Sequence, residues 1–278
     1  MAITTSMIKE LRDATSLGIA DCKKALEQTN GDFDAAVKIL REKGAAVAAK
    51  RASKEAKEGM VASNIAADIQ SGAMIELNCE TDFVTRNEDF QAFVEELRGE
   101  ALEFESDKMA EGVAKKVEDK MASIGEKIQF RRNVKWNVEG TGSITSYIHM
   151  GGKVGVLLEL GCEKAETIES PVYKELAKDL TLHVAAAAPE FLNRDEVPAE
   201  KVEEEKEIFR KQLEGKPENI IDNILVGKIN KFFSQICFIE QGFVKEDKVS
   251  ITDFVAEKGK ELGDTITIKR YVRYQLGA

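Results

Sequence analysis

The chain repeats part of its own sequence, and this repeat limits the possible folds more than any other feature. GMVASNIAADIQSGAMIELNCE at residues 59–80 aligns with GSITSYIHMGGKVGVLLELGCE at residues 142–163, an offset of 83 residues. Identical residues occur at eight of the 22 positions, namely Gly59, Ser63, Ile65, Gly72, Glu76, Leu77, Cys79 and Glu80. Solenoid repeats have shorter units, so this self-similarity predicts two duplicated subdomains.

A second pair of segments extends the repeat and reveals an insertion. IGEKIQFRRNVKWNV at residues 124–138 aligns with LGDTITIKRYVRYQL at residues 262–276, now at an offset of 138. The second copy therefore carries about 55 additional residues, beginning near residue 197. Two apolar stripes, Ile208 and Leu213 followed by Ile220, Ile224 and Ile229, flank Gly215-Lys216-Pro217. This pattern predicts an antiparallel coiled-coil hairpin over about 197–235, which should protrude because it is long and polar.

Each copy has the pattern of a strand hairpin, a helix and a closing strand. The same offset of 83 residues relates a set of apolar residues in the first copy to a set in the second, and both sets have the spacing of a buried helix stripe. The first set is Phe90, Phe93, Leu97 and Ala101, and the second is Tyr173, Leu176, Leu180 and Val184. The closing strand alternates apolar and polar residues, as in Ile128, Phe130, Val134 and Trp136. The predicted fold class is α+β, with core subdomain 1 at residues 59–138 and core subdomain 2 at 139–278.

Residues 1–44 are predicted to form a small module of three helices. Thr5 and Ser6 are candidate caps of the first helix, Asp21 of the second, and Asp32 of a third that runs through Lys43. The following stretch, residues 45–58, is rich in Ala, Lys and Glu and has few large apolar side chains. It has helix propensity but little to bury, so a linker is expected there.

The charge and cysteine content exclude several classes of protein. A formal net charge of −10 disfavours direct binding to nucleic acid or to an anionic membrane, since both require a basic surface. Four widely spaced cysteines without a CxxC pair favour reduced thiols over a zinc site or a disulfide scaffold. The sequence has no secretion signal at its start and no run of apolar residues long enough to span a membrane, so a cytoplasmic protein is expected.

The sequence contains no recognisable catalytic motif. The sequence contains no phosphate-binding GxxxxGK(S/T) loop, no GxGxxG that opens a helix, and only two histidines. His183 lies on a helical stripe and is interpreted as a core residue, whereas His149 lies at a glycine-flanked hairpin tip and is either a turn residue or a contact. Cys79 and Cys162 are interpreted as small buried residues at strand ends. We expect no enzyme activity, no cofactor and no metal site.

The joint between the first hairpin and its helix, NCETDFVTRNEDF at residues 78–90, contains a large aromatic residue beside an acid. Phe83 could fix the joint from inside the core, or it could be exposed together with Asp82. At an offset of 83, residues 81–84 correspond to Lys-Ala-Glu-Thr at 164–167. Because the sister joint lacks a large apolar residue, the repeat favours an exposed Phe83.

Two segments resemble signatures of the bacterial elongation factor Ts family, the nucleotide exchange factors of elongation factor Tu. LRDATSLGIADCKKAL at residues 11–26 resembles the N-terminal signature, and ELNCETDFVTR at residues 76–86 resembles the second and more specific one. The resemblance covers nearly the whole chain. It implies an N-terminal module of the ubiquitin-associated type, a doubled core and an inserted coiled-coil hairpin.

The resemblance also implies the roles of individual residues. The segment Thr81, Asp82, Phe83 and Val84 would enter the nucleotide domain of elongation factor Tu. Phe83 would wedge between helices and Asp82 would disturb the groups that hold magnesium, so that the ion and then GDP leave. The other positions implied to contact the partner are Arg12, Ile19, Ala20 and Lys23 in the N-terminal module, and Ile124, Gly125, His149 and Val244 in the core.

This chain departs from many relatives in two respects. They carry two methionines where this chain has Ile19-Ala20, which is expected to reduce apolar contact. Longer members also continue with a further helix beyond the strand that precedes Ala278, so a shorter-lived complex is expected here.

An exchange factor needs only a higher affinity for nucleotide-free than for GDP-bound elongation factor Tu, because binding effects are reciprocal. It requires no catalytic groups, and its contact can be an apolar wedge despite the acidic charge. Two other functions remain open at this point. A passive scaffold or chaperone-like protein could hold a helical partner through the N-terminal module and the hairpin, and an RNA chaperone is disfavoured by charge.

Overall fold

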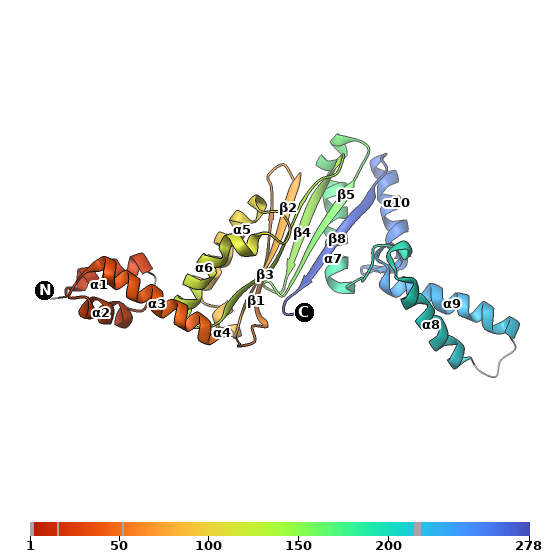
Figure 1. Cartoon of the computed structure of the whole chain (residues 1–278). Helices are drawn as coiled ribbons and strands as arrows, with labels where there is room; N and C mark the ends of the chain where they lie inside the picture. The colour runs from red at the N-terminus through yellow and green to blue at the C-terminus, as the bar shows by residue number, and fades with distance from the viewer. Residues whose placement is uncertain (1–2, 16, 52, 214–217) are drawn as a thin grey trace.

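The computed structural model describes residues 3–15, 17–51, 53–213 and 218–278. Its architecture combines helices with antiparallel sheets, so the predicted α+β class is confirmed. The chain begins in a group of helices, continues into two three-stranded sheets, and sends a pair of helices away from the second sheet (Figure 1). Short 3-10 helices occur at Ala101–Glu103, Ala165–Glu169, Arg194–Glu196 and Phe238–Glu240.

The N-terminal region consists of α1 (Thr5–Thr15), α2 (Ile19–Gln28) and α3 (Phe33–Arg51). Their shared core is the set Leu11, Cys22, Ala25, Leu26, Ala36 and Leu40. Asp32 caps α3 as predicted, since the amide of Ala35 donates to its Oδ1 at 2.9 Å. Asp21 lies in the first turn of α2, and Gly18 occupies the cap position predicted for it.

The third helix is longer than predicted. We expected it to stop at Lys43, before Gly44, but α3 continues to Arg51. Alanine, lysine and glutamate have high helix propensity, and α3 also gains support from α6 (Met109–Ile124). A Cβ on Gly44 would lie 3.1 Å from the Cβ of Ala122, so glycine permits a close approach of the two helices.

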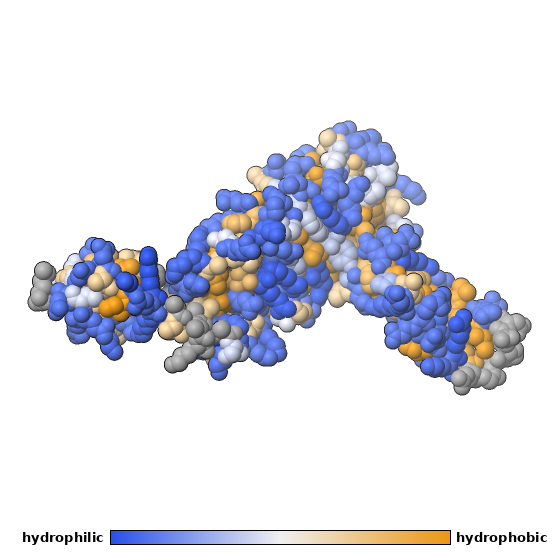
Figure 2. Space-filling view, in the orientation of Figure 1, coloured by the Kyte–Doolittle hydropathy of each residue, from blue (hydrophilic) through white to orange (hydrophobic). Residues whose placement is uncertain are grey.

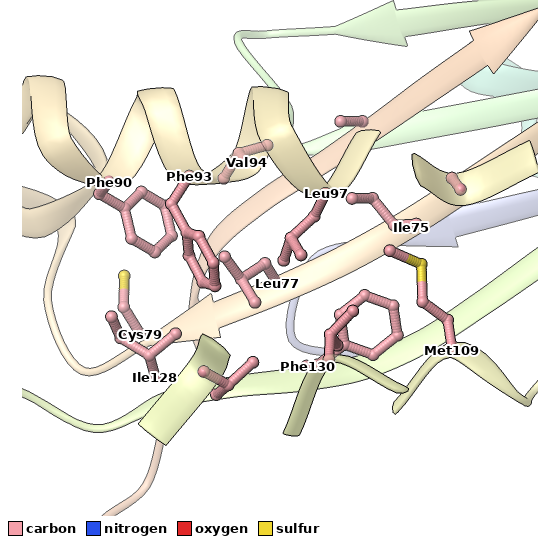
Figure 3. Packing of buried hydrophobic residues seen from close by; sticks show 14 of the residues in the cluster. Ile75, Leu77, Cys79, Phe90, Phe93, Val94, Leu97, Met109, Ile128 and Phe130 are labelled. Carbon is pink, nitrogen blue, oxygen red and sulfur yellow. The ribbon is translucent and has the colours of Figure 1, made fainter. Parts of the chain in front are cut away.

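The first sheet is formed by β1 (Glu58–Ile65), β2 (Ser71–Cys79) and β3 (Ile128–Asn137), in the order β1-β2-β3. Its helices are α4 (Asp82–Thr85), α5 (Glu88–Glu100) and α6. The predicted stripe is confirmed as core, because Phe90, Phe93 and Leu97 of α5 and Ala101 of the following 3-10 helix are all buried. Figure 3 shows the α5 side chains packed onto those of β2 and β3.

The second sheet is formed by β4 (Gly142–His149), β5 (Val154–Gly161) and β8 (Thr267–Gln275), in the order β4-β5-β8. It packs on α7 (Pro171–Ala187) and α10 (Ile251–Leu262), and a short hairpin of β6 (Gly242–Phe243) and β7 (Glu246–Ser250) precedes α10. The predicted stripe of α7 is also confirmed as core, namely Tyr173, Leu176, Leu180 and Val184.

The predicted unit of a hairpin, one helix and a closing strand was incomplete. A second helix precedes the closing strand in each copy, α6 in the first and α10 in the second. The sequence carried a signal for α6, since its buried residues Met109, Val113, Val117 and Met121 recur every fourth residue. Each sheet is therefore packed against two main helices.

The two sheets pack against each other. Val61, Met74 and Val134 of the first sheet share an apolar cluster with three residues of the second sheet, Ile144, Leu157 and Tyr274. Both faces of the central strands β2 and β5 are consequently covered, one by helices and one by the opposite sheet. This explains why both strands are almost continuously apolar and buried.

A buried carboxylate lies on the central strand of each sheet. Glu76 in β2 accepts a hydrogen bond from Arg132 Nε at 2.8 Å, and Glu159 in β5 accepts one from Arg270 Nε at 2.7 Å. Both glutamates are almost completely buried. Each lies at an irregularity in the pairing with the closing strand.

Each arginine also reaches an aromatic ring on the closing strand of the opposite sheet. Arg132 lies 4.0 Å from the ring centroid of Tyr274, and Arg270 lies 4.6 Å from that of Trp136. Trp136 and Tyr274 occupy equivalent repeat positions at the offset of 138. The contact of an arginine with an aromatic ring of the opposite sheet therefore occurs twice, between equivalent residues.

The inserted segment contains α8 (Ala199–Gln212) and α9 (Glu218–Ile236), which pack on each other and extend away from the sheets (Figure 1). The core at the base of the pair includes Leu225, Ile229, Phe232, Phe233 and Ile236. The predicted turn at Gly215-Lys216-Pro217 lies outside the described residues. Within the described ranges, no helix has the length and apolar character needed to cross a membrane.

Candidate functional site

The joint between β2 and α5 contains a single-turn helix, α4, which presents Phe83 to solvent. Phe83 is 76% exposed, whereas its neighbour Val84 is only 6% exposed. Val84 belongs to the core of the first sheet together with Cys79, Phe90 and Ala62. The predicted exposure of Phe83 is confirmed. Val84, also predicted as a partner contact, points inward and serves to anchor α4.

Asp82 begins α4 and is partly exposed. Its Oδ2 lies 3.1 Å from Nη2 of Arg86, one turn later in the chain. Ion pairs between exposed side chains contribute about 0–1 kcal/mol, so Asp82 can exchange Arg86 for another cation at little cost. The pair Asp82 and Phe83 thus offers a carboxylate and an aromatic ring on adjacent positions of one exposed turn.

The start of α4 is held by the turn after α6. Thr81 is the N-cap residue, but its hydroxyl does not cap the helix. It donates to the carboxylate of Glu126, with both oxygens at 3.1 Å. Ile124 and Gly125 end α6 just before Glu126, and Gly125 has a left-handed φ of 80°. The fold therefore brings two predicted site segments, 81–84 and 124–125, to one place.

Glu80 is a further member of this region that was not among the predicted site residues. Its carboxylate accepts two hydrogen bonds from Arg51 at the end of α3 and one from the amide of Lys127. These donors, the Lys127 amide first, hold the pKa of Glu80 below its ordinary value. Two sequence signals pointed to Glu80, namely its recurrence as Glu163 in the repeat and its place in the segment ELNCETDFVTR.

The predicted contacts in the N-terminal region lie apart from α4. Arg12 is on α1, while Ile19, Ala20 and Lys23 are on α2, and all four are exposed. Ile19 is a large apolar side chain that is 57% exposed. Lys23 forms a long i,i+4 pair with Glu27, in which Nζ and Oε1 are 3.8 Å apart. Figure 1 shows these helices at one end of α3 and α4 near the other.

His149 lies at the turn between β4 and β5, where it is exposed. Its Nδ1 is 2.8 Å from the hydroxyl of Tyr147. The next residue, Met150, is 71% exposed and has a left-handed φ of 49°. Met150 was missed from the sequence, although the glycines that follow it marked a tight turn. The amide of Val61 donates to the carbonyl of Gly152 at 2.8 Å, which holds this turn against β1.

Val244 lies at the turn of the β6–β7 hairpin and its side chain is exposed. Its backbone amide donates to Nδ1 of the buried His183 at 3.2 Å, and His183 Nε2 is 2.9 Å from Oε1 of Gln241. Nδ1 is thus an acceptor and Nε2 carries the proton. Burial lowers the pKa of His183. The interpretation of His183 as a core residue is confirmed, and it fixes the backbone that presents Val244.

The four thiols are not joined in disulfides. Cys22, Cys79, Cys162 and Cys237 are all free, and burial raises the pKa of Cys79 to about 12. Cys79 is buried as predicted, whereas Cys162 is partly exposed. Among the described residues, no group of three or more His, Cys, Asp or Glu side chains could hold a metal ion.

The surface around these positions is mainly polar. Figure 2 shows a largely hydrophilic face, with apolar side chains gathered over the N-terminal helices and along α8 and α9. Among the described residues, the large apolar side chains with high exposure are Ile19, Phe83, Met150, Ile208, Val226 and Val244. They include three predicted contact residues, Ile19, Phe83 and Val244.

Comparison with known proteins yields one consistent result. The family model described as Elongation factor TS matches residues 80–278. A protein named Elongation factor Ts from Clostridium botulinum (strain Alaska E43 / Type E3) is 44% identical over 287 residues, covering 99% of this chain and 93% of its own. One of the same name from Trichlorobacter lovleyi is 43% identical, covering 100% and 93%. Another from Nitratidesulfovibrio vulgaris (strain DP4) is 41% identical, covering 100% and 96%.

Proposed function

The chain belongs to the elongation factor Ts family and is thereby a translation elongation factor, and on this premise we propose that it is a guanine nucleotide exchange factor. It binds elongation factor Tu in the GDP-bound state, displaces magnesium and promotes release of GDP, so that GTP can bind. The partner is elongation factor Tu in its GDP-bound and nucleotide-free forms, and the setting is the cytoplasm.

The observation that carries this proposal is the exposure of Phe83 on a turn whose next residue is buried. Leaving a phenylalanine ring in water sacrifices about 1.5–3 kcal/mol of burial free energy, which a partner can recover. Val84 in the core prevents the turn from rotating to bury Phe83. Such an anchored aromatic residue can insert between helices of the nucleotide domain of the partner.

Asp82 supplies the second element of the mechanism. When Asp82 lies beside the magnesium site of the partner, its carboxylate disturbs the groups that hold the ion. It repels those that are negatively charged and forms new pairs with those that are positively charged. Loss of the ion removes charge compensation from the phosphates of GDP and weakens nucleotide binding. Separation from Arg86 costs little, as the exposed pair is weak.

The thermodynamics require no catalytic group on this chain. A protein that binds nucleotide-free elongation factor Tu more tightly than the GDP complex must weaken GDP binding by the same factor. We therefore propose a binding protein rather than an enzyme, without cofactor, nucleic acid or membrane as a direct ligand. The net charge of −10 fits an apolar wedge better than an electrostatic clamp.

The remaining parts of the chain are proposed to support this wedge. Residues 1–44 form a ubiquitin-associated-like module that binds the same domain through α1 and α2, and residues 45–58 connect it to the core. Residues 59–138 and 139–278 are duplicated core subdomains. The second carries a coiled-coil hairpin at about 197–235, formed by α8 and α9. Partner contacts of the core include Ile124, Gly125, His149 and Val244.

Release of a fluorescent GDP analogue from elongation factor Tu tests the proposal. Substoichiometric amounts of this protein should accelerate release and turn over many times. A passive scaffold would bind elongation factor Tu and leave the release rate unchanged. That result would overturn the proposal in favour of a scaffold or chaperone-like role.

A further inference from the structure

We propose that Arg51 and Glu80 are positioning residues that couple the N-terminal helices to the turn bearing Asp82 and Phe83. Their ion pair fixes the end of α3 to the residue that precedes Thr81. The ion pair thereby fixes the position of α1 and α2 relative to α4, so that all three helices can contact one partner at the same time. This inference rests on the proposed exchange function and names residues to which that function assigned no role.

The ion pair has the geometry of a specific contact. Nη1 of Arg51 lies 3.0 Å from Oε1 and 2.9 Å from Oε2 of Glu80, across 29 residues of sequence. The Glu80 side chain is only 15% exposed. Charge-assisted hydrogen bonds from a guanidinium fix direction as well as distance, so the pair restrains the end of α3.

Glu80 is itself held rigidly on its other side. The backbone amide of Lys127 donates to Oε1 of Glu80 at 2.6 Å. The adjacent Thr81 is bound to Glu126, the residue before Lys127. Residues 80–81 and 126–127 therefore form one tied unit at the base of α4, and Arg51 connects α3 to this unit.

The connection matters because α3 is one continuous helix. It begins at Phe33 within the N-terminal core and ends at Arg51, a length of 19 residues. At about 1.5 Å per residue this is a rod of roughly 28 Å. A restraint at Arg51 consequently sets the orientation of the helices that carry Arg12 and Ile19.

The repeat supplies an internal comparison. Glu163 is the equivalent of Glu80 in the second copy, and its side chain is exposed. Within the part of the chain that the structure describes, Glu163 forms no salt bridge. Its loop is held instead by Asp264, which accepts hydrogen bonds from the amides of Glu163 and Lys164, both at 3.1 Å. The ion pair is thus absent from the copy that lacks an exposed aromatic residue.

The test uses the full chain with Arg51→Met, Arg51→Lys, Glu80→Gln and the double variant Arg51→Met/Glu80→Gln. Glu163→Gln is the matched control. The first readout is acceleration of fluorescent GDP release from elongation factor Tu over a range of concentrations. The second is hydrogen exchange of the amides of residues 81–86 in the free protein, which does not depend on the partner.

We expect Arg51→Met to lower the apparent second-order rate constant of exchange about tenfold, with Arg51→Lys restoring most of it. The double variant should be no worse than the more affected single variant. Amide exchange at residues 81–86 should accelerate in Arg51→Met and Glu80→Gln and remain unchanged in Glu163→Gln. Melting temperatures equal to that of the wild type would show that the variants lose positioning of α4 and do not unfold.

Provided that the wild-type protein accelerates GDP release, the inference is overturned if Arg51→Met matches the wild type in either readout, or if the two single losses add in the double variant. Failure of the exchange function has a different signature, because the wild-type protein itself would then not accelerate GDP release. In that case the hydrogen-exchange comparison still decides whether Arg51 and Glu80 position α4.

Discussion

The side-chain oxygens of Ser63 and Ser146 lie 3.0 Å apart, and the two serines are separated by the repeat offset of 83 residues. Ser63 is on β1 and Ser146 on β4, so equivalent residues of the two sheets meet each other. Contact between equivalent residues is the arrangement expected at a local two-fold axis. The two sheets therefore present matching surfaces to each other.

The serine pair should contribute measurably to stability. Replacing either serine by alanine removes one hydrogen bond and should lower the free energy of unfolding by about 1 kcal/mol. Urea unfolding of Ser63→Ala, Ser146→Ala and the double variant forms a mutant cycle. Because both single changes break the same bond, the double variant should lose less than the sum. Fully additive losses would show that the two hydroxyls act independently.

The buried carboxylate Glu76 should be among the most sensitive positions for folding. Glu76→Gln leaves the guanidinium of Arg132 without its charge partner. Removing one member of a buried pair costs about 3–5 kcal/mol, and the partial exposure of Arg132 favours the lower end, about 3 kcal/mol. Chemical denaturation measures the loss. Glu139→Gln is the control, since the side chain of Glu139 is largely exposed and its pair with Arg270 is long.

Substitutions of Phe83 and Val84 should have different effects, the first on exchange activity and the second on stability. Phe83→Ala should leave the melting temperature nearly unchanged and reduce affinity for nucleotide-free elongation factor Tu by at least ~2 kcal/mol, about 30-fold, as expected for a central aromatic anchor. Val84→Ala removes buried methyl groups and should lower stability by about 2 kcal/mol. Thermal unfolding and GDP-release assays on both variants provide the comparison. A destabilised Phe83→Ala that retains full exchange activity would contradict the proposed wedge.

Protonation of His183 should make the protein less stable in mildly acidic solution. Burial lowers its pKa below the ordinary value of 6.5, so the unfolded chain takes up the proton more readily than the folded chain. This contribution to stability is fully present above about pH 6.5 and is lost as the pH falls toward the folded pKa. Urea unfolding at pH 7.5 and 5.5 should therefore show a smaller pH-dependent loss in His183→Gln than in the wild type.

Local patterns in the sequence predicted many of the helices and strands, although α6 and α10 were missed. The stripes at Phe90 and Tyr173 were predicted from the repeat offset together with their spacing, because a helix that covers a sheet must repeat its apolar residues every three to four positions. The exposure of Phe83 also followed from the sequence. The repeat supplied an equivalent joint without an aromatic residue, and this comparison outweighed the usual tendency of phenylalanine to be buried.

The tertiary structure decided which residues far apart in the sequence meet. Arg51 and Glu80 are separated by 29 residues and Glu76 and Arg132 by 56, and no local periodicity encodes such pairs. The same limit explains the length of α3, since support for the Ala-rich end of that helix comes from α6 in another part of the chain. Sequence patterns report which face of an element is apolar, whereas ion pairs and helix ends depend on what the folded chain places beside them.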